Sequence, residues 1–564
     1  MKYSNFLLPT QKESSNDYDS EAMKYMVRSG MVKKVSSGMF TYLPYFNMIM
    51  RKVEYAIRRG MDNVECSEVK FPLLVSEEAL TTSNRWNAYG KEMFKLTDRN
   101  NNGYAISPTN EEYATMLATE MVKSYNDLPF SVYQIQRKYR DEIRPRNGLI
   151  RAREFTMKDA YSYHRSMDEL MAYYDRMKKE YLKIFSGLGI KVVPVMADSG
   201  AIGGNHCEEF MAITSEGEAS IAFCDDCGYG ANDETVPCEN HFKLNTNKAK
   251  IEKIKTPHVS SIADLVSFLG TTAQNFVKSM VYRADDKIVV ALVRGDREVN
   301  ETKLQKLTGA TLLELATEKD IKNIGSVIGF VGPVGLKNVA VFADNEIMSM
   351  QNFVVGANER DYHLKNVNPT DFACTWADLR FADENDRCPH CGGHLKFAKG
   401  NELGHIFAIG TRYTDKFNST YVDNNNKNQI MYMGCYGIGL ERVAVSIIEQ
   451  SRDEKGMVLP MHVAPFKVNI IVVDANREEQ LAFGTKLYNE LEDSGVPVLL
   501  DDRKARAGAK FSDHELIGVP IKVVVGKGLE NGVVEVQFAR TEPVQIKLAD
   551  AKKYILDLIK KNSK

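Results

Sequence analysis

The stretch YRDEIRPRNGLIRAREFTMKD, residues 139–159, concentrates five arginines, one lysine and four carboxylates around the turn Pro145–Gly148. Strand-like sequence on both sides of that turn predicts two antiparallel strands. Side chains alternate across a strand, so residues two apart share a face. The side chains expected to line one face of this hairpin are Arg140, Glu142, Arg151, Arg153 and Phe155. The hairpin therefore predicts a sheet surface that carries guanidinium groups, a carboxylate and one aromatic ring.

These side chains suit a nucleoside triphosphate. Guanidinium groups present paired N–H donors that match phosphate and carboxylate oxygens. The ring of Phe155 can stack on a purine, and Glu142 can accept a hydrogen bond from an exocyclic amine. The pattern predicts an ATP site on antiparallel strands. A solvated, salt-bridged hairpin is the alternative interpretation, because exposed ion pairs are common on protein surfaces.

A second stretch, MYMGCYGIGLERVAVSIIEQ at residues 431–450, supports the nucleotide interpretation. Its pattern predicts a strand, then glycines that allow close backbone approach, then an apolar helix. Arg442 lies at the start of that helix, where a side-chain cation and the helix N-terminus can meet one phosphate. The stretch lacks the third glycine of a dinucleotide-binding fingerprint and the Gly-Lys-Ser/Thr of a P-loop.

Composition bounds the class of protein. The 564 residues suggest about three or four domains. The net charge of −2 gives no overall positive field of the kind that indicates nucleic-acid binding, although a local basic surface is compatible with it. No apolar run reaches the roughly 18 residues that a membrane helix needs. Residues 1–15 have no long apolar signal core, so we expect a cytoplasmic location.

Periodicity predicts several elements. Residues 20–60 are expected to be helical, and CSEVKFPLL, residues 66–74, to be a strand stopped by Pro72. Residues 109–124 are expected to form a helix that opens with a capping box of Thr109 and Glu112. The predicted apolar stripe of that helix consists of Tyr113, Met116, Leu117 and Met121.

Three motifs together resemble those of the class II aminoacyl-tRNA synthetases. YRDE followed by RAREFTMKD resembles motif 2, GCYGIGLER resembles motif 3, and RRGMDNVECSEVKFPLL resembles motif 1, usually a dimer-interface element. More narrowly, ISPTNEE, YQIQRKYRDEIRPRNGLIRAREFTMKDAYSYH and MGCYGIG resemble the bacterial-type prolyl-tRNA synthetases. The resemblance covers essentially the whole chain and implies a homodimer.

The resemblance implies an α+β multidomain fold. A catalytic core on an antiparallel sheet would occupy residues 1–223 and 405–465, an inserted α/β editing domain residues 224–404, and a C-terminal α/β anticodon-binding domain residues 466–564. From about residue 465, strands and helices alternate, which independently predicts an α/β module with a partly parallel sheet.

The resemblance also assigns the residues of an ATP site. Arg140 would contact the α-phosphate and the activated carboxylate, Glu142 the adenine amine, and Arg151 the γ-phosphate. Phe155 would stack on adenine, and Arg442 would lie on the other side of the triphosphate.

An amino-acid site is implied in the same way. Thr109 and Glu111 match a Thr-x-Glu signature that holds the substrate's amino group, which needs a buried carboxylate partner. Tyr163, His164 and Cys435 would line a small proline pocket. His164 is equally open to being a core histidine with satisfied hydrogen bonds.

The implied reaction joins L-proline to tRNA(Pro). The proline carboxylate attacks the α-phosphorus of ATP and pyrophosphate leaves, after which the terminal ribose hydroxyl of the tRNA attacks the prolyl-adenylate and AMP leaves. The arginines and Mg²⁺ would stabilise the phosphate charge, so that catalysis rests on positioning and electrostatics.

A proline pocket cannot strongly exclude the smaller alanine, because a missing methylene is worth only about 1–3 kcal/mol. The insertion is similar to the domain that hydrolyses mischarged alanyl-tRNA(Pro) in this family. The residues that match its site are Lys278, Gly329, Pro333, Asp344 and His363. Lys278 and Asp344 are also open to being ordinary surface charges if the site has decayed.

Four of the nine cysteines form two Cys-x-x-Cys pairs that flank the insertion. Cys224, Cys227, Cys388 and Cys391 together predict a structural Zn²⁺ site with four thiolate ligands. Reduced free thiols or a metal-free remnant are the alternatives.

Two other functions stay open. One is a different class II ligase, such as a threonyl or glycyl enzyme; threonyl enzymes hold zinc inside the aminoacylation site, whereas these cysteines flank the insertion. The other is an editing or tRNA-binding protein with an inactive synthetase core, which the intact Arg140, Glu142, Arg151, Phe155 and Arg442 argue against.

Overall fold

The computed structural model describes residues 1–13, 18, 20–197, 206–238, 242–246, 249–310 and 312–562. The chain divides into two compact units, one made of Met1–Ala219 and Lys399–Lys564 and the other of Ser220–Ala398. The second unit is therefore one continuous stretch inserted into the first. None of the helices described is both long and apolar enough to cross a membrane.

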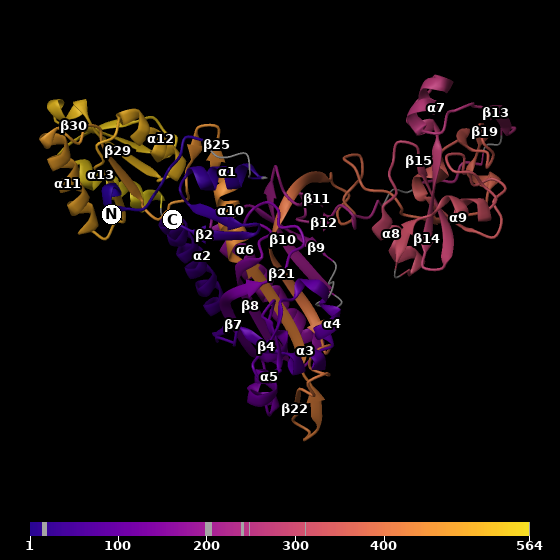
Figure 1. Ribbon diagram of the computed structural model, residues 1–564, viewed down its shortest axis with the longest axis horizontal. Coiled ribbons are helices and arrows are strands. Elements are labelled where there is room, and N and C mark those ends of the chain that lie inside the picture. The colour runs from indigo at the N-terminus through magenta and orange to yellow at the C-terminus, as the bar shows by residue number, and fades with distance from the viewer. Residues whose placement is uncertain are drawn as a thin grey trace. The chain divides into compact units, whose positions relative to one another are not determined.

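A largely antiparallel sheet forms the centre of the first unit (Figure 1). Across it, the strands of this unit are β9 (Val192–Met196), β10 (His206–Thr214), β21 (Lys396–Gly410), β24 (Tyr432–Gly439), β8 (Glu154–His164), β7 (Phe130–Tyr139) and β3 (Ser67–Glu68). Strands β7 and β8 are antiparallel neighbours, as predicted, and β24 pairs with the other edge of β8. The two arginine-bearing stretches of sequence thus meet on adjacent strands.

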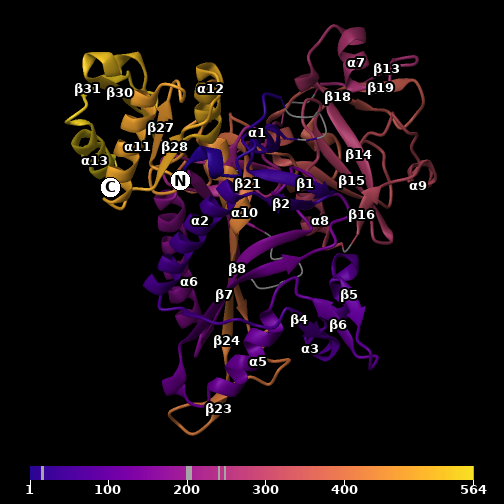
Figure 2. The same ribbon diagram turned by 60° about the vertical axis from the view of Figure 1, so that its left-hand side comes forward.

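Helices cover one face of this sheet. In Figure 2, α2 (Pro44–Asn63) and α6 (Met167–Gly187) run along the same side of β24, and α10 (Leu440–Gln450) follows β24 directly. The buried positions of α6 recur every three or four residues and pack against the sheet. They include Leu170, Tyr174, Met177, Tyr181 and Ile184.

A second, smaller sheet also belongs to the first unit. Its strands are β4 (Leu74–Ser76), β6 (Gly103–Ile106) and β5 (Lys95–Thr97). Two short helices follow β4, namely α3 (Glu77–Thr82) and α4 (Arg85–Ala88), and α5 (Glu111–Met121) follows β6. Two hairpins complete this part, β22 (Thr420–Val422) with β23 (Asn428–Ile430) and β25 (Arg452–Asp453) with β26 (Gly456–Met457).

The last hundred residues form the predicted α/β module. Its strands lie in the order β28 (Val498–Asp501), β27 (Val468–Val472), β29 (Ile521–Val525), β30 (Val533–Phe538) and β31 (Val544–Lys547). The first three are parallel and the last two antiparallel, so the expected partly parallel sheet is confirmed. The helices are α11 (Glu478–Glu492), α12 (Ala507–Ile517) and α13 (Ala551–Asn562).

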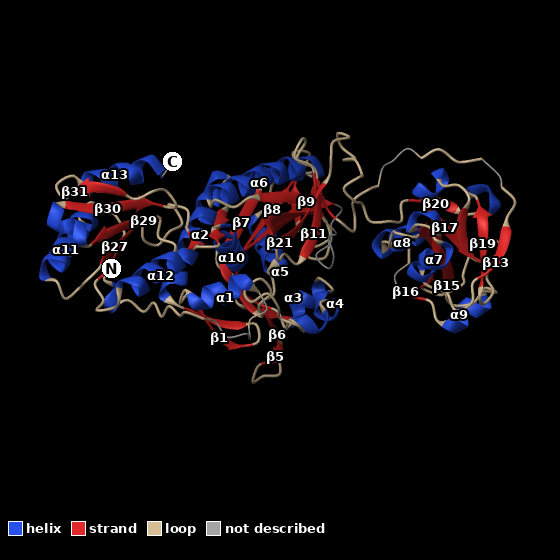
Figure 3. Ribbon diagram, turned by 90° about the horizontal axis from the view of Figure 1, so that it is seen from above, coloured by secondary structure: helices blue, strands red, loops and turns tan. Residues whose placement is uncertain are grey.

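The inserted unit has its own sheets and cores (Figure 3). One sheet has the order β16 (Leu313–Leu315), β14 (Val277–Ala284), β15 (Lys287–Arg294), β17 (Ala340–Asp344) and β20 (Thr375–Ala377). The other consists of β13 (Glu252–Lys255), β19 (Tyr362–Val367) and β18 (Phe353–Gly356). The helices are α7 (Ile262–Leu269), α8 (Glu301–Thr308) and α9 (Glu318–Asn323), and the unit begins with the hairpin β11 (Ala219–Phe223) and β12 (Gly230–Asn232).

The prediction that residues 20–60 are helical throughout is wrong. Residues 20–60 contain α1 (Glu21–Arg28), then the hairpin β1 (Val32–Ser36) and β2 (Met39–Tyr42), and only then α2. Gly38 makes the hairpin turn at a φ of +72°, a conformation that glycine adopts without steric cost. The expected strand over residues 66–74 is also wrong, because only Ser67–Glu68 joins the sheet and Leu74 starts β4 in a different one.

The helix predicted at 109–124 exists, but its start and its buried face differ from the prediction. It begins at Glu111, with Asn110 as the N-cap residue and no capping box. Met116 and Met121 are exposed, whereas Glu111 and Glu112 are fully buried. The apolar stripe is correct for Tyr113 and Leu117, which pack against the core, and wrong for Met116 and Met121. A buried arginine, described below, draws both carboxylates inward.

The predicted hairpin is correct in its pairing and wrong in its length. Strand β7 ends at Tyr139 and β8 begins at Glu154, so Arg140, Glu142 and Arg151 belong to the connecting loop and only Phe155 stands on a strand. The alternation of side chains along a strand therefore does not determine where Arg140, Glu142 and Arg151 lie. Their positions depend on contacts inside the loop.

Candidate functional site

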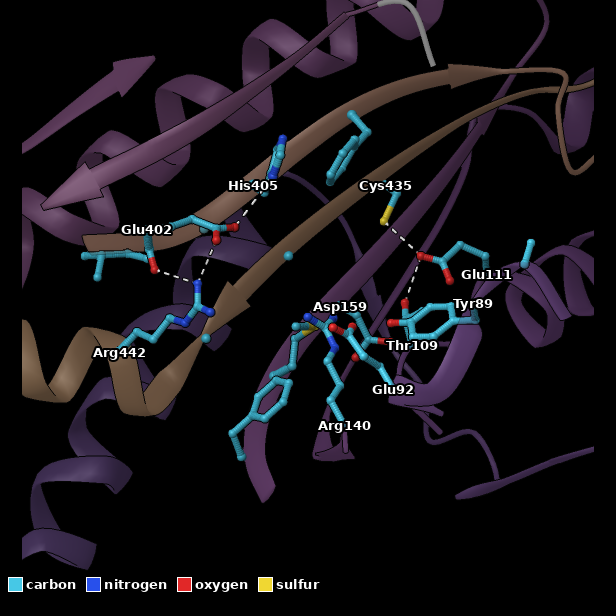
Figure 4. A pocket seen from close by; sticks show the side chains of 18 residues that line it. Tyr89, Glu92, Thr109, Glu111, Arg140, Asp159, Glu402, His405, Cys435 and Arg442 are labelled. Atoms are coloured by element: carbon cyan, nitrogen blue, oxygen red, sulfur yellow. Dashed lines mark hydrogen bonds and ion pairs between the residues drawn. The ribbon is translucent and has the colours of Figure 1, made fainter. Parts of the chain in front are cut away.

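A cavity of about 350 Å³ lies over β8, β21 and β24 in the first unit. Side chains from distant parts of the chain line it, among them Thr109, Glu111, Arg140, Phe155, Cys435 and Arg442. Figure 4 shows Thr109, Glu111 and Cys435 gathered at one side and Glu402, His405 and Arg442 at the other. The cavity therefore has a carboxylate end and a guanidinium end.

Glu111 dominates the carboxylate end and has no exposed surface. Its Oε1 accepts hydrogen bonds from the Thr109 hydroxyl at 2.8 Å and the Cys435 thiol at 3.6 Å. Its Oε2 accepts from Arg85 Nη1 at 2.7 Å. Burial by itself would raise the pKa of Glu111, but the charge of Arg85 and the bond from Thr109 outweigh it and lower that pKa. The site thus holds a buried, ionised carboxylate beside a cavity.

Hydrogen bonds beneath the cavity fix the segment before α5. The Tyr161 hydroxyl accepts from the backbone N–H of Asn110 at 2.9 Å and donates to Asp159 at 2.8 Å. Asp159 lines the cavity and pairs with the fully buried Lys138 at 3.2 Å. This network holds Thr109 and Glu111 against β8.

Arg140 and Phe155 mark the middle of the cavity. The guanidinium carbon of Arg140 lies 5.3 Å from the centroid of the Phe155 ring. A small adjoining hollow is lined by these two residues together with Glu142, Arg151 and Arg442. Arg151 Nε donates to Glu142 Oε2 at 2.8 Å. All five residues expected at an ATP site therefore border connected space, although the loop rather than a sheet face brings them together.

Arg442 fixes the guanidinium end. Its Nε donates to the Ile150 carbonyl at 2.9 Å, and its Nη1 donates to Glu402 Oε2 at 2.7 Å. Burial opposes the charge of Glu402, but Arg442 and His405 hold the pKa of Glu402 below its ordinary range. His405 Nδ1 lies 3.6 Å from both Glu402 and Glu209. Burial would lower the pKa of His405, but a hydrogen bond with Cys207 and the two carboxylates outweigh it and raise that pKa to about 9.

Glu209 and Glu402 offer carboxylate oxygens to a divalent cation. Together with a nitrogen of His405, these oxygens lie within 4.8 Å of one another. Burial and the neighbouring Glu402 raise the pKa of Glu209 to about 7. Carboxylate oxygens are the donors that Mg²⁺ prefers, so these residues fit the metal that a nucleoside triphosphate carries.

Two residues expected in the amino-acid pocket do not line the cavity. The Tyr163 hydroxyl lies 3.1 Å from Thr115 Oγ1, inside the core. His164 is buried with its Nε2 2.9 Å from Ser162 Oγ, against the Tyr173 ring, and burial lowers the pKa of His164 to about 4. The pocket placement is therefore wrong for both, and His164 has the core role that was the open alternative. Cys435 does line the cavity.

Several residues at or behind the cavity have no sequence signal. Tyr89, which lines the cavity, and Arg85, which lies behind it, belong to the short α4 and its end, where no periodicity is measurable. Glu402 and His405 stand on β21 beside other polar residues, namely Lys396, Lys399 and Asn401, so no local pattern indicates them.

The inserted unit has a separate cavity of about 350 Å³. Lys278, Gly329 and His363 line it, and Lys278 Nζ lies 2.7 Å from Glu298. Pro333 and Asp344, which were expected at the same site, do not. Asp344 is buried and accepts hydrogen bonds from the backbone N–H groups of Glu346 and Leu379. The expectation of a catalytic position is thus wrong for Asp344, since its oxygens hold two loops together.

The four cysteines of the two Cys-x-x-Cys pairs do converge. Their sulfurs lie within 4.8 Å of one another, with 3.7 Å between Cys224 and Cys391 and 3.6 Å between Cys227 and Cys388. A tetrahedral Zn²⁺ with bonds of about 2.3 Å separates its sulfur ligands by about 3.8 Å. The backbone N–H of His390 also points at Cys388 Sγ, at 3.4 Å. The donor set and its spacing fit zinc.

Comparisons with known proteins agree with this geometry. Residues 94–451 match the model of the tRNA synthetase class II core domain (G, H, P, S and T), and residues 467–558 match the anticodon binding domain. The predicted class II core and anticodon-binding domain are therefore confirmed. The inserted unit lies within the matched core range, and its function is not tested by these matches.

Full-length relatives are similar over nearly the whole chain. A proline–tRNA ligase of Caldicellulosiruptor saccharolyticus is 46% identical, covering 99% of this chain and 98% of the relative. One of Brachyspira hyodysenteriae is 44% identical, covering 98% and 97%. The crystal structure of a Cryptosporidium parvum prolyl-tRNA synthetase complexed with L-proline and AMP has a TM-score of 0.58 at 16% identity, covering 98% of this chain and 78% of that one, which supports the fold. The chain therefore belongs to the class II aminoacyl-tRNA synthetases and, within them, to the proline–tRNA ligases.

Proposed function

We propose that the chain activates L-proline with ATP and transfers it to tRNA(Pro), releasing pyrophosphate and then AMP. One observation carries the proposal: a single cavity joins a buried, ionised carboxylate at one end to a fixed guanidinium at the other. A cationic amino group fits the first end and a polyphosphate fits the second. With the ammonium at the first end and the phosphates at the second, the amino-acid carboxylate would lie beside the α-phosphate, where the acyl–phosphate bond forms.

At the amino-acid end, Glu111 accepts the secondary ammonium of proline, and Thr109 orients Glu111. Cys435 contributes a small apolar wall. Arg140 lies between the two ends and meets both the substrate carboxylate and the α-phosphate. Because no side chain becomes covalently attached, the protein contributes orientation and charge stabilisation.

At the nucleotide end, Phe155 stacks on adenine, Glu142 accepts from its amine, and Arg151 and Arg442 neutralise the departing pyrophosphate. Mg²⁺ bound by Glu209 and Glu402 would supply further positive charge to the phosphates when present. The pairs Arg151–Glu142 and Arg442–Glu402 hold these side chains in place before they meet the nucleotide.

We also propose that the inserted unit removes alanine from mischarged alanyl-tRNA(Pro). Its support is the second cavity, where Lys278 and His363 face largely apolar walls. Lys278 would hold the tRNA-linked substrate, and a positioned water would cleave the ester. Pro333 and Asp344 support the loops around this cavity in the proposal. Loss of alanyl-tRNA hydrolysis in Lys278→Ala, with prolyl-tRNA synthesis intact, is the expected result; unchanged hydrolysis would refute the assignment.

Three further proposals follow from family membership and residue placement. Cys224, Cys227, Cys388 and Cys391 bind a structural Zn²⁺ that ties together the two chain segments at the base of the insertion. The chain acts as a homodimer, on the strength of its motif 1 sequence. It works in the cytoplasm, where its tRNA substrate is.

The function is tested by aminoacylation with radiolabelled proline, ATP and bacterial tRNA. Formation of acid-precipitable prolyl-tRNA that depends on ATP is the expected result. Charging with threonine or glycine instead would favour another class II ligase, and alanyl-tRNA hydrolysis without any charging would favour an editing protein with an inactive core.

A further inference from the structure

Two charged residues behind the amino-acid end have no part in the reaction as described. Arg85, in α4, is 4% exposed, and Glu112, in α5, has no exposed surface. Arg85 Nη1 donates to Glu111 at 2.7 Å and to Glu112 at 3.2 Å. Glu112 also accepts from the Ser83 hydroxyl at 2.6 Å. Neither Arg85 nor Glu112 lines the cavity, whereas Glu111 does.

The buried cluster holds two carboxylates and one guanidinium. Buried charges are costly unless they are paired. Burial and the neighbouring Glu111 raise the pKa of Glu112, whereas the pKa of Glu111 is lowered, so the negative charge lies mainly on Glu111 and draws an additional cation there. Glu111 offers the place for it, because its Oε2 is held by Arg85 while its Oε1 faces Thr109 and Cys435 at the cavity wall. The secondary ammonium of proline carries the charge that completes the cluster.

We propose that Arg85 is a positioning residue for the amino-acid substrate: it holds Glu111 so that Oε1 is presented to the substrate's ammonium, and Glu112 anchors Arg85 in turn. This inference rests on the proposed function, because it takes Glu111 as the ammonium's partner. Arg85 touches neither the nucleotide nor the substrate and acts only through Glu111.

The same guanidinium ties α4 to the cavity. It lies 5.0 Å from the centroid of the Tyr89 ring and 5.8 Å from that of Tyr413. Ala88 and Tyr89 line the cavity, so the helix that carries them is anchored on the carboxylate that receives the substrate. The affinity for proline and the position of the cavity wall formed by Ala88 and Tyr89 therefore both depend on the side chain of Arg85.

Glu111 is the group near this site whose protonation depends most directly on the charge of Arg85. The other titratable or charged groups that face it are Glu112, Lys138, Asp159, Tyr161, Tyr163, Tyr413 and Cys435. Burial raises the pKa of the Cys435 thiol and of the Tyr161 hydroxyl, so both stay neutral. Removing Arg85 removes the charge that offsets the burial of Glu111, so Glu111 takes up a proton more readily and loses its attraction for an ammonium.

The experiment measures KM for L-proline, KM for ATP and competitive inhibition by tetrahydrofuran-2-carboxylate in ATP–pyrophosphate exchange. The analogue keeps the ring and carboxylate of proline but has an ether oxygen in place of the ammonium. Arg85→Lys keeps the charge and loses the geometry of the guanidinium. The double variant Arg85→Met/Glu112→Gln removes one charge of each sign, so it tests the inference even where Arg85→Lys does not fold. Glu78→Gln, at an exposed position of α3, is the matched control that leaves the Arg85–Glu111 pair intact.

Arg85→Lys and the double variant are expected to raise KM for proline by about tenfold or more without raising KM for ATP or weakening inhibition by the analogue. In the double variant, KM for proline falls as the pH rises, because Glu111 then ionises. Glu78→Gln stays within about threefold of the wild type.

Equal losses for proline, ATP and the analogue would overturn the inference, since they would show a purely structural role. An unchanged KM for proline in both Arg85 variants would overturn it as well. In either case the wild type still activates proline, and only failure of the wild type to do so would count against the proposed function itself.

Discussion

Arg442 and Glu402 are 40 residues apart in the chain, yet Nη1 of the first lies 2.7 Å from Oε2 of the second at the edge of the cavity. The same arginine donates from Nε to the Ile150 carbonyl in the loop that connects β7 and β8. A planar guanidinium satisfies both acceptors at once, and a lysine ammonium has no such fork. Arg442 is thus fixed between the stretch 139–159 and β21 before any phosphate arrives.

Arg442→Lys is therefore expected to weaken ATP binding although the charge is kept. We expect KM for ATP to rise by about tenfold or more, because both fixed contacts of the guanidinium are lost. Initial rates of proline-dependent pyrophosphate exchange at varied ATP measure this. Arg144→Lys, at an exposed position in the same loop, is the matched control and should behave like the wild type. An unchanged KM for ATP in Arg442→Lys would contradict this role.

Arg140→Ala removes the cation between the two ends of the cavity. Loss of one group that stabilises transition-state charge commonly costs about 10²–10³ in rate, and we expect a fall of that size in kcat/KM for proline. Arg144→Ala controls for the general charge of the loop. A fall of less than about threefold in Arg140→Ala, or equal falls in both variants, would show that the loop acts through its overall charge.

The zinc proposal predicts about one Zn²⁺ per chain by elemental analysis. Cys388→Ser should lower the zinc content and make the inserted unit more susceptible to limited proteolysis, because two chain segments are no longer tied together. Cys374→Ser alters a cysteine outside the cluster and should change neither property. Wild-type protein without zinc, purified in the absence of chelators, would contradict the proposal.

Lys158 predicts an unusual dependence of stability on pH. It lies in the core, donating to the Tyr436 carbonyl at 3.0 Å, and burial lowers the pKa of Lys158 to about 7. Between that value and the ordinary lysine pKa, the unfolded chain binds a proton that the folded chain does not, so this group makes stability rise with pH. At about 1.4 kcal/mol per pKa unit, the rise amounts to roughly 5 kcal/mol.

Lys158→Met should remove this contribution. Thermal midpoints of the wild type and the variant at about pH 7 and pH 9.5 measure it, and the wild type should gain stability relative to the variant at the higher pH. Lys191→Met, at an exposed position, should follow the wild type at both pH values. Parallel behaviour of Lys158→Met and wild type would show that Lys158 is charged in the fold.

Local sequence predicted the parts of the fold that local rules determine. The pairing of β7 with β8, the strand-to-helix passage into α10 and the partly parallel C-terminal sheet all follow from turn residues and periodicity. Convergence of the two Cys-x-x-Cys pairs was also expected from their spacing alone.

At α5, long-range ion pairs made the prediction from local sequence rules wrong. Periodicity placed Met116 and Met121 in the apolar stripe and the capping box made Glu112 a cap residue, whereas Met116 and Met121 are exposed and Glu112 is buried. The cause is Arg85, 26 residues before Glu111, whose guanidinium needs both carboxylates. The sequence of the helix itself does not indicate such a distant partner. For the same reason, local sequence did not predict that Glu402 and Glu209 lie beside Arg442 and His405.

The central claim is that this cavity activates proline. Its most direct test is ATP–pyrophosphate exchange with proline, alanine, threonine and glycine each supplied alone at matched concentrations. Strong exchange with proline, weak exchange with alanine and none with threonine or glycine is the predicted result. Absence of exchange with proline, or a preference for any of the other three, would contradict the claim.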